Sequence, residues 1–253
     1  MNIRLDGKVA LVTGGSSGIG QAIVRSLAAS GAAVAVNYIA SRMPADATVD
    51  GILDAGGKAV ALEADVSDPV AVQAMFAQLD HTLGAPDILI NCAGIDGKAV
   101  PGWEADPVAW RKVIEVNLFG TFYCAQQALQ RMIRRKSGVI LNITSVHETI
   151  AWSGYSAYTS SKAAVSMLTK TLAQEAAPFG VRVLAVAPGA IQTDINKSVW
   201  TDPIQNADLI EKIPMGRLGV VDESAAMVTF MASEECSFTT ASVFDTSGGR
   251  TTY

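Results

Sequence analysis

The sequence predicts an α/β protein: a single doubly wound Rossmann-type domain over residues 1–253, with a mostly parallel sheet of about seven strands. Short apolar runs typical of buried strands alternate with segments of helical periodicity, which indicates strand–helix–strand units. A glycine-rich turn separates the first such run from the first helical segment. The length of 253 residues and the 49% hydrophobic content fit one domain with a large core.

The predicted strands are short and apolar, as expected in a sheet that helices cover on both faces. The run at residues 88–90, Ile-Leu-Ile, is entirely apolar. In chain order we expect strands at residues 9–12, 33–36, 59–62, 88–90, 139–143, 181–186 and 242–244.

The predicted helices lie between these strands, at residues 19–29, 45–54, 69–83, 107–135, 155–177 and 222–232. Pro69 suits the first turn of its helix, and Asp68 suits the cap. The helix at 107–135 is expected to bend near its middle. Residues 188–214 lack a strong regular pattern and are expected to hold short helices. Because they follow the carboxyl edge of the sheet, residues 189–214 are predicted to form a substrate lid, mobile without cofactor.

Composition argues against several classes of function. The net charge is −5, the sequence pI is about 5.0, and Lys and Arg are scattered singly, so no nucleic-acid partner is expected. The cationic run at 131–136 ends a predicted helix, where cations complement the dipole. No apolar stretch could span a bilayer and the first residues lack a signal pattern, so a cytoplasmic protein without membrane contact is expected. Three separate cysteines indicate free core thiols and no metal site: Cys92, Cys124 and Cys236.

The glycine-rich turn at residues 13–20 lies between the first predicted strand and helix. Glycine permits a tight turn, close approach to a pyrophosphate and close helix packing, and the helix N-terminus offers free N–H groups. The spacing is GxxxGxG, and not the GxGxxG of the general fingerprint. A tight turn with a packing glycine is the alternative, but the position after the first strand favours a dinucleotide. The expected contacts are Gly14, Ser16, Ser17, Gly18, Ile19 and Gly20.

The tip of the second strand should decide which dinucleotide binds. An acid there would hold the ribose 2′-hydroxyl of NAD, whereas a basic residue would meet the 2′-phosphate of NADP. The tip carries Asn37 and Tyr38, without a carboxylate, and Arg42 follows within reach. We therefore expect NADP or NAD as cofactor, with NADP favoured. The alternative for Arg42 is a solvated loop side chain.

Tyr158 and Lys162 are four residues apart in a helical pattern, so they project from one face. A free tyrosine titrates near pH 10 and is a poor base at neutral pH. A nearby ammonium and the positive ring of an oxidised nicotinamide would both favour the phenolate. Ser145 follows an apolar strand, and its hydroxyl could bond the same substrate oxygen. A surface Tyr/Lys pair is the alternative.

With these motifs, the chain resembles the short-chain dehydrogenase/reductase family over nearly its whole length. The resemblance implies that Asp65 and Val66 hold the adenine and that Asn91, Ala93 and Gly94 line the cofactor cleft. It also places Pro188, Gly189, Ile191 and Thr193 against the cofactor, with Thr193 at the carboxamide. Cys92 departs from the asparagine more usual in the family.

The same resemblance assigns the catalytic roles. Asn117 would anchor a proton-relay water at a kink in its helix, and Ser145 would orient the substrate. Tyr158 would transfer the proton, while Lys162 would bind the nicotinamide ribose and tune Tyr158. Read without the family, Asn91 could merely cap a loop and Asn117 could be a satisfied polar residue within a helix.

A closer resemblance is to bacterial glucose 1-dehydrogenases, which implies a sugar substrate. The positions that match Asp96, His147 and Asn196 would then contact sugar hydroxyls, together with Ser145 and Tyr158. Three departures stand against this reading: Ile39 in place of a basic residue, a longer loop at 95–110, and an end at Tyr253. The rival is a ketoreductase for less polar carbonyls, which the aromatic residues of the expected cleft favour: Trp152, Tyr155 and Trp200.

Two alternatives lie outside enzymes: a non-catalytic nucleotide sensor and a scaffold protein. The intact set of Asn117, Ser145, Tyr158 and Lys162 argues against a sensor, and the intact phosphate turn argues against a scaffold. The family resemblance further implies a homo-oligomer, either a dimer or a tetramer, formed through the two long helices at 107–135 and 155–177.

Overall fold

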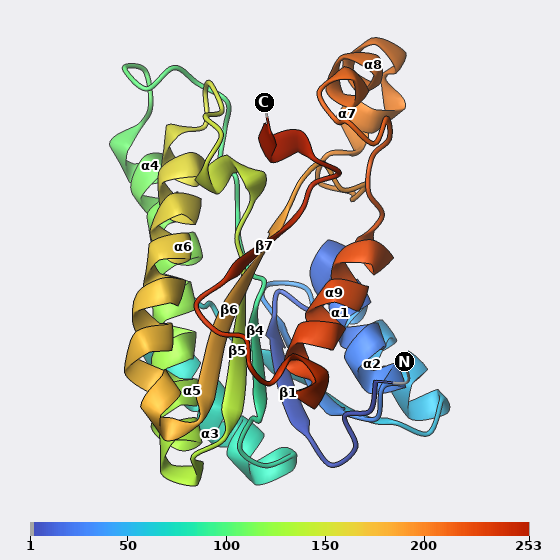
Figure 1. The fold of residues 1–253 in the computed structure, drawn as a ribbon, viewed down its shortest axis with the longest axis vertical. Coiled ribbons are helices and arrows are strands. Elements are labelled where there is room, and N and C mark those ends of the chain that lie inside the picture. Colours follow the sequence, from blue (N-terminus) through green and yellow to red (C-terminus); the bar gives the residue numbers. More distant parts are fainter. Residues whose placement is uncertain (1–2, 253) are drawn as a thin grey trace.

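A computed structural model describes residues 3–252 as one sheet covered by helices on both faces (Figure 1). The sheet has seven strands in the order β3-β2-β1-β4-β5-β6-β7, and every pair is parallel. The predicted fold class is therefore confirmed. The strands are β1 (Val9–Thr13), β2 (Ala33–Tyr38), β3 (Lys58–Glu63), β4 (Ile88–Asn91), β5 (Gly138–Ile143), β6 (Val181–Pro188) and β7 (Val243–Thr246).

The helices form two layers around this sheet. The α-helices are α1 (Gly18–Ala29), α2 (Met43–Asp54), α3 (Pro69–Thr82), α4 (Pro107–Ile114), α5 (Gly120–Arg135), α6 (Ser156–Ala176), α7 (Lys197–Thr201), α8 (Pro203–Glu211) and α9 (Val221–Ala232). Short 3-10 helices are η2 (Val146–Glu148), η3 (Ala177–Phe179), η4 (Glu234–Cys236) and η5 (Arg250–Thr252). One core cluster joins the sheet to α1, α2 and α9, and the other joins it to α3, α5 and α6.

Successive side chains along a strand point to opposite faces of the sheet and so enter the two core clusters in turn. In β1, Ala10 and Val12 enter the cluster beneath α1 and α9, whereas Leu11 enters the cluster beneath α3 and α5. All three are fully buried. A strand that is buried on both faces needs apolar residues at every position, which explains the continuous apolar runs of the sequence.

The predicted long helix at 107–135 is divided as expected. A π-helical turn, η1 (Glu115–Phe119), lies between α4 and α5 and carries Asn117. Such turns insert one extra residue into the helical ladder and frequently mark functional sites. The regular α-helix is thus interrupted in the middle of the predicted range, at a kind of turn where helices commonly bend.

From β1 the sheet grows in two directions: β2 and β3 lie on one side of it, and β4 to β7 lie on the other. In open α/β sheets a crevice for ligands forms at this point, beyond the carboxyl ends of the strands. The small α7–α8 unit and the C-terminal η5 stand at the same end of the molecule (Figure 1). The short helices expected in residues 188–214 are therefore α7 and α8.

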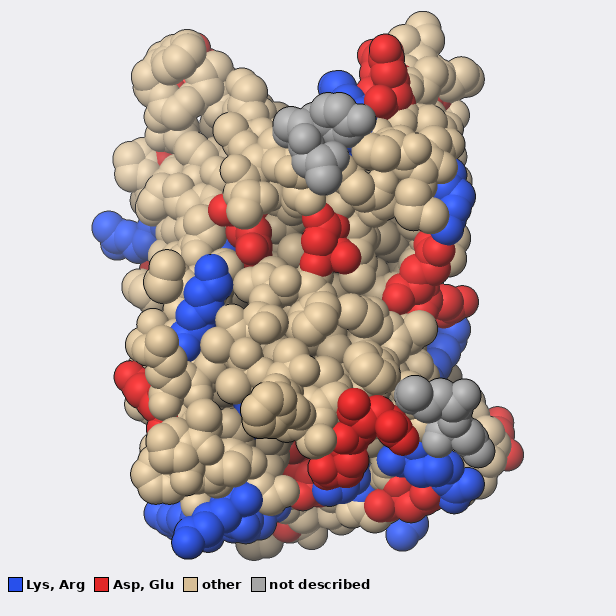
Figure 2. Space-filling view, viewed as in Figure 1, with Lys and Arg blue, Asp and Glu red and all other residues tan. Residues whose placement is uncertain are grey.

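Surface and composition predictions can also be compared with the structure. On the face shown in Figure 2, Lys and Arg gather at the lower end among Asp and Glu, and no basic stripe crosses it. Residues 3–252 contain no helix that is long and apolar enough to cross a bilayer. Over the same residues no cluster of His, Cys, Asp or Glu could hold a metal ion. All three cysteines are free thiols.

Candidate active site

The glycine-rich turn joins β1 to α1 at the carboxyl edge. Gly14 and Gly18 adopt φ of 62° and 51°, the left-handed region that favours glycine. A Cβ on Gly14 would lie 2.9 Å from Ala93 Cα, so the turn also packs against the end of β4. Ser17 occupies the N-cap position of α1, yet its side chain makes no capping hydrogen bond. The first N–H groups of α1 therefore have no capping side chain, which is the arrangement that binds anions.

Gly20 sets the separation between α1 and the turn, and we expect Gly20→Ala to abolish this geometry. Its Cβ would lie 2.2 Å from the Gly14 carbonyl oxygen, closer than any real contact. The backbone would have to shift, at a cost of about 1–3 kcal/mol in stability, and dinucleotide affinity should fall at least about tenfold. Protein fluorescence on NADPH titration measures the affinity, and thermal melting measures the stability.

Gly51→Ala is the matched control. Gly51 lies within α2, and a Cβ there would meet no atom within 4 Å. This variant should bind dinucleotide normally and be slightly more stable, since alanine favours helix over glycine. Normal NADPH affinity in Gly20→Ala would contradict the role assigned to the turn.

Residues at the carboxyl end of β2 hold the glycine-rich turn in place through hydrogen bonds. Asn37 is buried, and its Oδ1 accepts a hydrogen bond from Gly14 N at 3.2 Å while its Nδ2 donates to Leu62 O and Ala64 O. Its side chain thus ties the turn to the end of β3. The Tyr38 hydroxyl donates to Glu63. Arg42 is 70% exposed and pairs with Asp46 at 3.0 Å. Contacts of these three residues with a cofactor stay predictions.

The loop after β3 and the end of β4 form the next wall. The Asp65 carboxylate accepts from the Ser67 hydroxyl and from Lys112, whose Nζ lies 3.2 Å away. Val66 is buried against Gly120 at the start of α5. Asn91 donates to Asn142, and its Oδ1 is buried without a partner in the described residues. The sequence did not reveal Lys112, because a helical surface lysine carries no local signal of its partner.

Thr13 also escaped sequence analysis, although it fixes the relation of β1 to β4. Its hydroxyl accepts hydrogen bonds from Cys92 N at 3.0 Å and Ala93 N at 3.1 Å. Burial raises the pKa of the Cys92 thiol to about 11. Cys92 is therefore a neutral packing residue at physiological pH, and its backbone N–H is held by the Thr13 hydroxyl.

Asn117 lies in the π-helical turn and is 1% exposed. Its amide both accepts from Ile95 N and donates to Ile95 O, each at 2.8 Å, and it also donates to the Ser161 hydroxyl. A Cβ on Gly94 would meet Asn117 Oδ1 and Lys162 Nζ. Asn117 thus joins the loop after β4 to α6, and its relay role stays a prediction.

Ser145, Tyr158 and Lys162 come together at the carboxyl ends of β5 and β6. Lys162 Nζ donates to Ile143 O at 2.8 Å and lies 5.6 Å from the centre of the Tyr158 ring. Ser145 is buried, and its hydroxyl accepts from His147 N. The helical spacing therefore places the predicted phenol and ammonium on one face of α6, and Ser145 lies near enough to act on the phenol.

Burial dominates the ionisation of this trio. It raises the pKa of Tyr158, a rise that a hydrogen bond with Ser145 opposes and that the charge of Asp96 reinforces. It also lowers the pKa of Lys162 to about 8. At pH 7 Lys162 is thus mostly charged, whereas Tyr158 is a neutral phenol. Ionisation of Tyr158 needs more positive charge than the protein alone supplies.

His147, Trp152 and Tyr155 form an aromatic stack beside Tyr158. The Trp152 ring lies 4.5 Å from the His147 ring and 3.8 Å from the Tyr155 ring, and its edge meets Tyr158. His147 Nδ1 lies 3.1 Å from Ile150 O. A carbonyl only accepts, so Nδ1 carries the hydrogen and Nε2 is an acceptor in the neutral ring. Burial lowers the pKa of His147 and so maintains this neutral form.

The strand β6 leads into the predicted lid. Asn196 Oδ1 accepts from Thr193 N and from its hydroxyl, and Asn196 Nδ2 donates to Ile191 O. A Cβ on Gly18 would lie 3.6 Å from Thr193 Cγ2, so Thr193 reaches over the glycine-rich turn. The Asn196 side chain therefore shapes this loop, and its predicted sugar contact is not tested. Close packing of Gly189 on Ser247 fixes the Pro188–Gly189 step.

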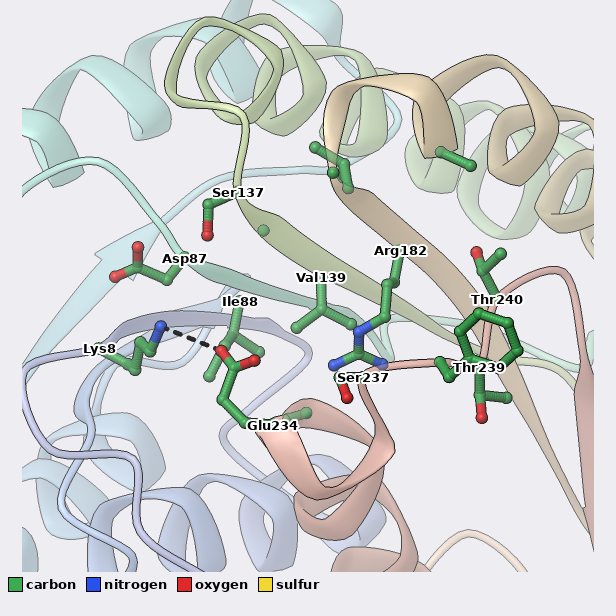
Figure 3. A pocket seen from close by; sticks show the side chains of 16 residues that line it. Lys8, Asp87, Ile88, Ser137, Val139, Arg182, Glu234, Ser237, Thr239 and Thr240 are labelled. Carbon is green, nitrogen blue, oxygen red and sulfur yellow. Dashed lines mark ion pairs between the residues drawn. The ribbon is translucent and has the colours of Figure 1, made fainter.

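A second hollow lies at the opposite, amino edge of the sheet (Figure 3). Lys8 pairs there with Glu234 at 3.5 Å, and Arg182 donates to Met231 O and Ser233 O. Its cations therefore already have partners, and none of the predicted site residues lines it. This hollow is therefore separate from the predicted site residues at the carboxyl edge.

Comparison with known proteins gives matches along the whole chain. A family model described as enoyl-(acyl carrier protein) reductase matches residues 14–251. A 2-dehydro-3-deoxy-L-rhamnonate dehydrogenase (NAD(+)) from Sphingomonas sp. is 45% identical over 99% of this chain and 98% of its own. A 3β-hydroxysteroid dehydrogenase 1 from Eggerthella lenta is 42% identical over 98% of this chain and 95% of its own.

Glucose 1-dehydrogenase 2 from Bacillus subtilis is 38% identical over 98% of this chain and 96% of its own, as the sequence resemblance led us to expect. Among solved structures, a gluconate 5-dehydrogenase from Burkholderia cenocepacia in complex with NADP and tartrate superposes with a TM-score of 0.94. It is 34% identical and covers 100% of this chain and 98% of its own.

Proposed function

Since the chain belongs to the short-chain dehydrogenase/reductase family, we propose that it interconverts a hydroxyl and a carbonyl group on a sugar-like substrate, with Tyr158 as acid and base. The observation that carries this proposal is the proximity of the Lys162 ammonium to the Tyr158 phenol at the end of β5, with Ser145 acting on the same phenol. A sensor or scaffold would have no use for a buried ammonium next to a phenol.

The residues present fit a nicotinamide dinucleotide. The turn offers a cradle that side chains at Gly14 or Gly20 would fill, and Ser17 leaves the N-terminus of α1 without a capping side chain. Asp65 and Val66 would flank the adenine, and Thr193 would close over the nicotinamide end. When bound, the nicotinamide supplies or accepts the hydride.

The proton is handled by Tyr158. In alcohol oxidation its phenolate accepts the proton of the substrate hydroxyl, and in carbonyl reduction its phenol donates a proton to the carbonyl oxygen. Ser145 bonds the same oxygen and holds it against Tyr158. Burial raises the pKa of Tyr158, and the Lys162 ammonium, 5.6 Å from the centre of its ring, supplies positive charge that would favour the phenolate.

Polar groups around Tyr158 favour a polyhydroxylated substrate. The neutral His147 offers Nε2 as an acceptor, and the Asp96 charge acts on both Tyr155 and Tyr158 from the loop after β4. The aromatic residues give less support to an apolar substrate. His147 and Tyr155 both stack on Trp152, and Trp200 packs on the lid cluster with its Nε1 donating to Thr193 O.

NADP is the cofactor that this site favours. The tip of β2 from Asn37 to Arg42 carries no carboxylate that would repel a 2′-phosphate, and Arg42 is exposed there. The relative of known structure binds NADP, whereas the rhamnonate enzyme is named for NAD(+). Either cofactor would place its nicotinamide ring at the same trio.

A panel of sugars, sugar acids and aromatic or steroid ketones tests the function, with NADP and NAD in parallel and reduced-cofactor absorbance as the readout. We expect turnover on a polyhydroxylated compound and a higher kcat/KM with NADP. Preference for the ketones would favour the ketoreductase alternative. The absence of turnover on every panel member with both cofactors would contradict the proposal.

Three further expectations accompany this function. Residues 189–214 form the lid, because α7 and α8 pack on a small cluster of their own: Ala190, Ile213 and Leu218, with Trp200, Leu209 and Ile210. The long α5 and α6 carry exposed apolar side chains that suit contacts between copies in a dimer or tetramer: Phe122 and Met167. A cytoplasmic location suits the three free thiols.

A further inference from the structure

Arg250 begins the short helix η5, which follows β7 at the carboxyl edge of the sheet. The chain is held on both sides of it. Thr251 Oγ1 bonds the Asp245 carboxylate, and Met215 N donates to Gly248 O at 3.1 Å. The guanidinium of Arg250 therefore projects from a fixed stretch of backbone.

The surroundings of Arg250 are unlike those of the other arginines. Burial lowers its pKa, and no acidic group acts against that shift. Among the arginines of residues 3–252, only Arg250 is partly buried and yet has neither an ion pair nor a hydrogen bond through its side chain. The others either have partners, as Arg131 has Asp80 and Arg182 has Met231 O, or are exposed to water. A partly dehydrated cation without a partner is costly, and a bound anion would offset that cost.

Arg250 also lies on the active-site side of the molecule. Burial lowers the pKa of His147, and the positive charge of Arg250 lowers it further, so the two side chains are electrostatic neighbours. His147 in turn stacks on Trp152, whose edge meets Tyr158. In Figure 1 the end of the chain lies between the start of α6 and the α7–α8 unit. Substrate held at Tyr158 would extend toward this end.

We propose that Arg250 binds a carboxylate of the substrate, so that the enzyme acts on a sugar acid in preference to the neutral sugar. This inference rests on the proposed function. A planar guanidinium forms paired hydrogen bonds with one carboxylate, and such charge-assisted bonds are strong and directional. The carboxylate end of the substrate is then anchored at Arg250. A hydroxyl further along the carbon chain of the substrate meets Ser145 and Tyr158. Asp96 and His147 Nε2 accept hydrogen bonds from the remaining hydroxyls.

The test uses two compounds that differ only at the charged end: D-gluconate and D-glucitol. Calorimetry with the protein–NADPH complex measures binding without turnover, because a reduced cofactor cannot oxidise an alcohol. We expect the complex to bind gluconate at least about tenfold more tightly than glucitol. Arg250→Gln should remove this difference and leave NADPH affinity unchanged, while Arg250→Lys should retain part of it.

Arg217→Gln is the matched control, since Arg217 is exposed and paired with Glu223. It should bind both compounds as the unaltered protein does. Equal binding of gluconate and glucitol by the unaltered protein would overturn the inference, as would discrimination that survives in Arg250→Gln.

Turnover measurements distinguish a failure of this inference from a failure of the proposed function. Oxidation of both compounds with equal kcat/KM would leave the sugar dehydrogenase intact and overturn the carboxylate site. Tight gluconate binding that depends on Arg250, without oxidation of any polyhydroxylated compound, would establish the carboxylate site and overturn the proposed activity.

Discussion

Replacing Tyr158 with phenylalanine is expected to lower kcat by about 10³-fold or more in both directions of the reaction, because proton transfer by a positioned group contributes about 10²–10⁴-fold. The change removes one hydroxyl and keeps the ring that meets the edge of Trp152 and lies below the Lys162 ammonium. Affinity for NADP and the melting temperature should therefore stay close to those of the unaltered protein. Initial rates, cofactor titration and thermal melting measure the three quantities.

Tyr123→Phe provides the control for this experiment. Tyr123 lies on α5, packed against the core beneath that helix and beside Phe119 and Phe122. Loss of its hydroxyl should leave kcat unchanged. A Tyr158→Phe variant that retained more than about a tenth of the activity would have lost less than about tenfold in rate. That loss is smaller than the lowest contribution usual for a proton-transferring group, so the proton would have to pass through another group.

Replacing Lys162 with methionine should have the second largest effect. The change removes the buried ammonium and its bond to Ile143 O while keeping an unbranched chain of similar length. Without that positive charge the Tyr158 phenolate is less favoured. We expect kcat/KM for oxidation at pH 7 to fall by about 10²-fold or more, since a shift of two pKa units is a hundredfold change in the fraction ionised. The rise of the oxidation rate with pH should move to higher pH. Lys170→Met, an exposed lysine on the same helix, is the control.

Stability gives an independent readout of Lys162. Its pKa is about 8 in the folded protein, lowered by burial, and higher in the unfolded chain. Below pH 8 the folded state thus carries an unfavourable buried charge, and this penalty disappears as the pH rises through 8 toward 10. The melting temperature of Lys162→Met, relative to the unaltered protein, should accordingly decrease over that range. A difference that is independent of pH over that range would show that burial does not lower the pKa of Lys162.

Local patterns in the sequence predicted the fold and the placement of Tyr158 beside Lys162. Every predicted strand is present, because a parallel sheet covered on both faces requires apolar runs that are visible without tertiary information. Tyr158 and Lys162 share a helix, so their spacing alone places them on one face. An irregularity in the middle of the long helix was also expected, and the structure has a π-helical turn there, at Asn117.

Contacts between distant segments could not be predicted in the same way. The side chain of Asn37 bonds Gly14, Leu62 and Ala64, a set of partners fixed only when three strands align. Arg250 carried no signal at all. Its position depends on β7 pairing with β6, which brings the end of the chain to the carboxyl edge beside His147.

Tyr158 should become acidic when an oxidised nicotinamide binds beside Lys162. The most direct test of this change is the difference between the phenolate absorbance of the unaltered protein and that of Tyr158→Phe, followed with pH. Burial raises the pKa of Tyr158 in the protein alone. With NADP+ bound, the difference signal should titrate at a pH lower by about two units or more, as positive charge favours the anion. With NADPH, whose ring is neutral, a much smaller shift is expected. An identical titration without cofactor, with NADP+ and with NADPH would contradict the account.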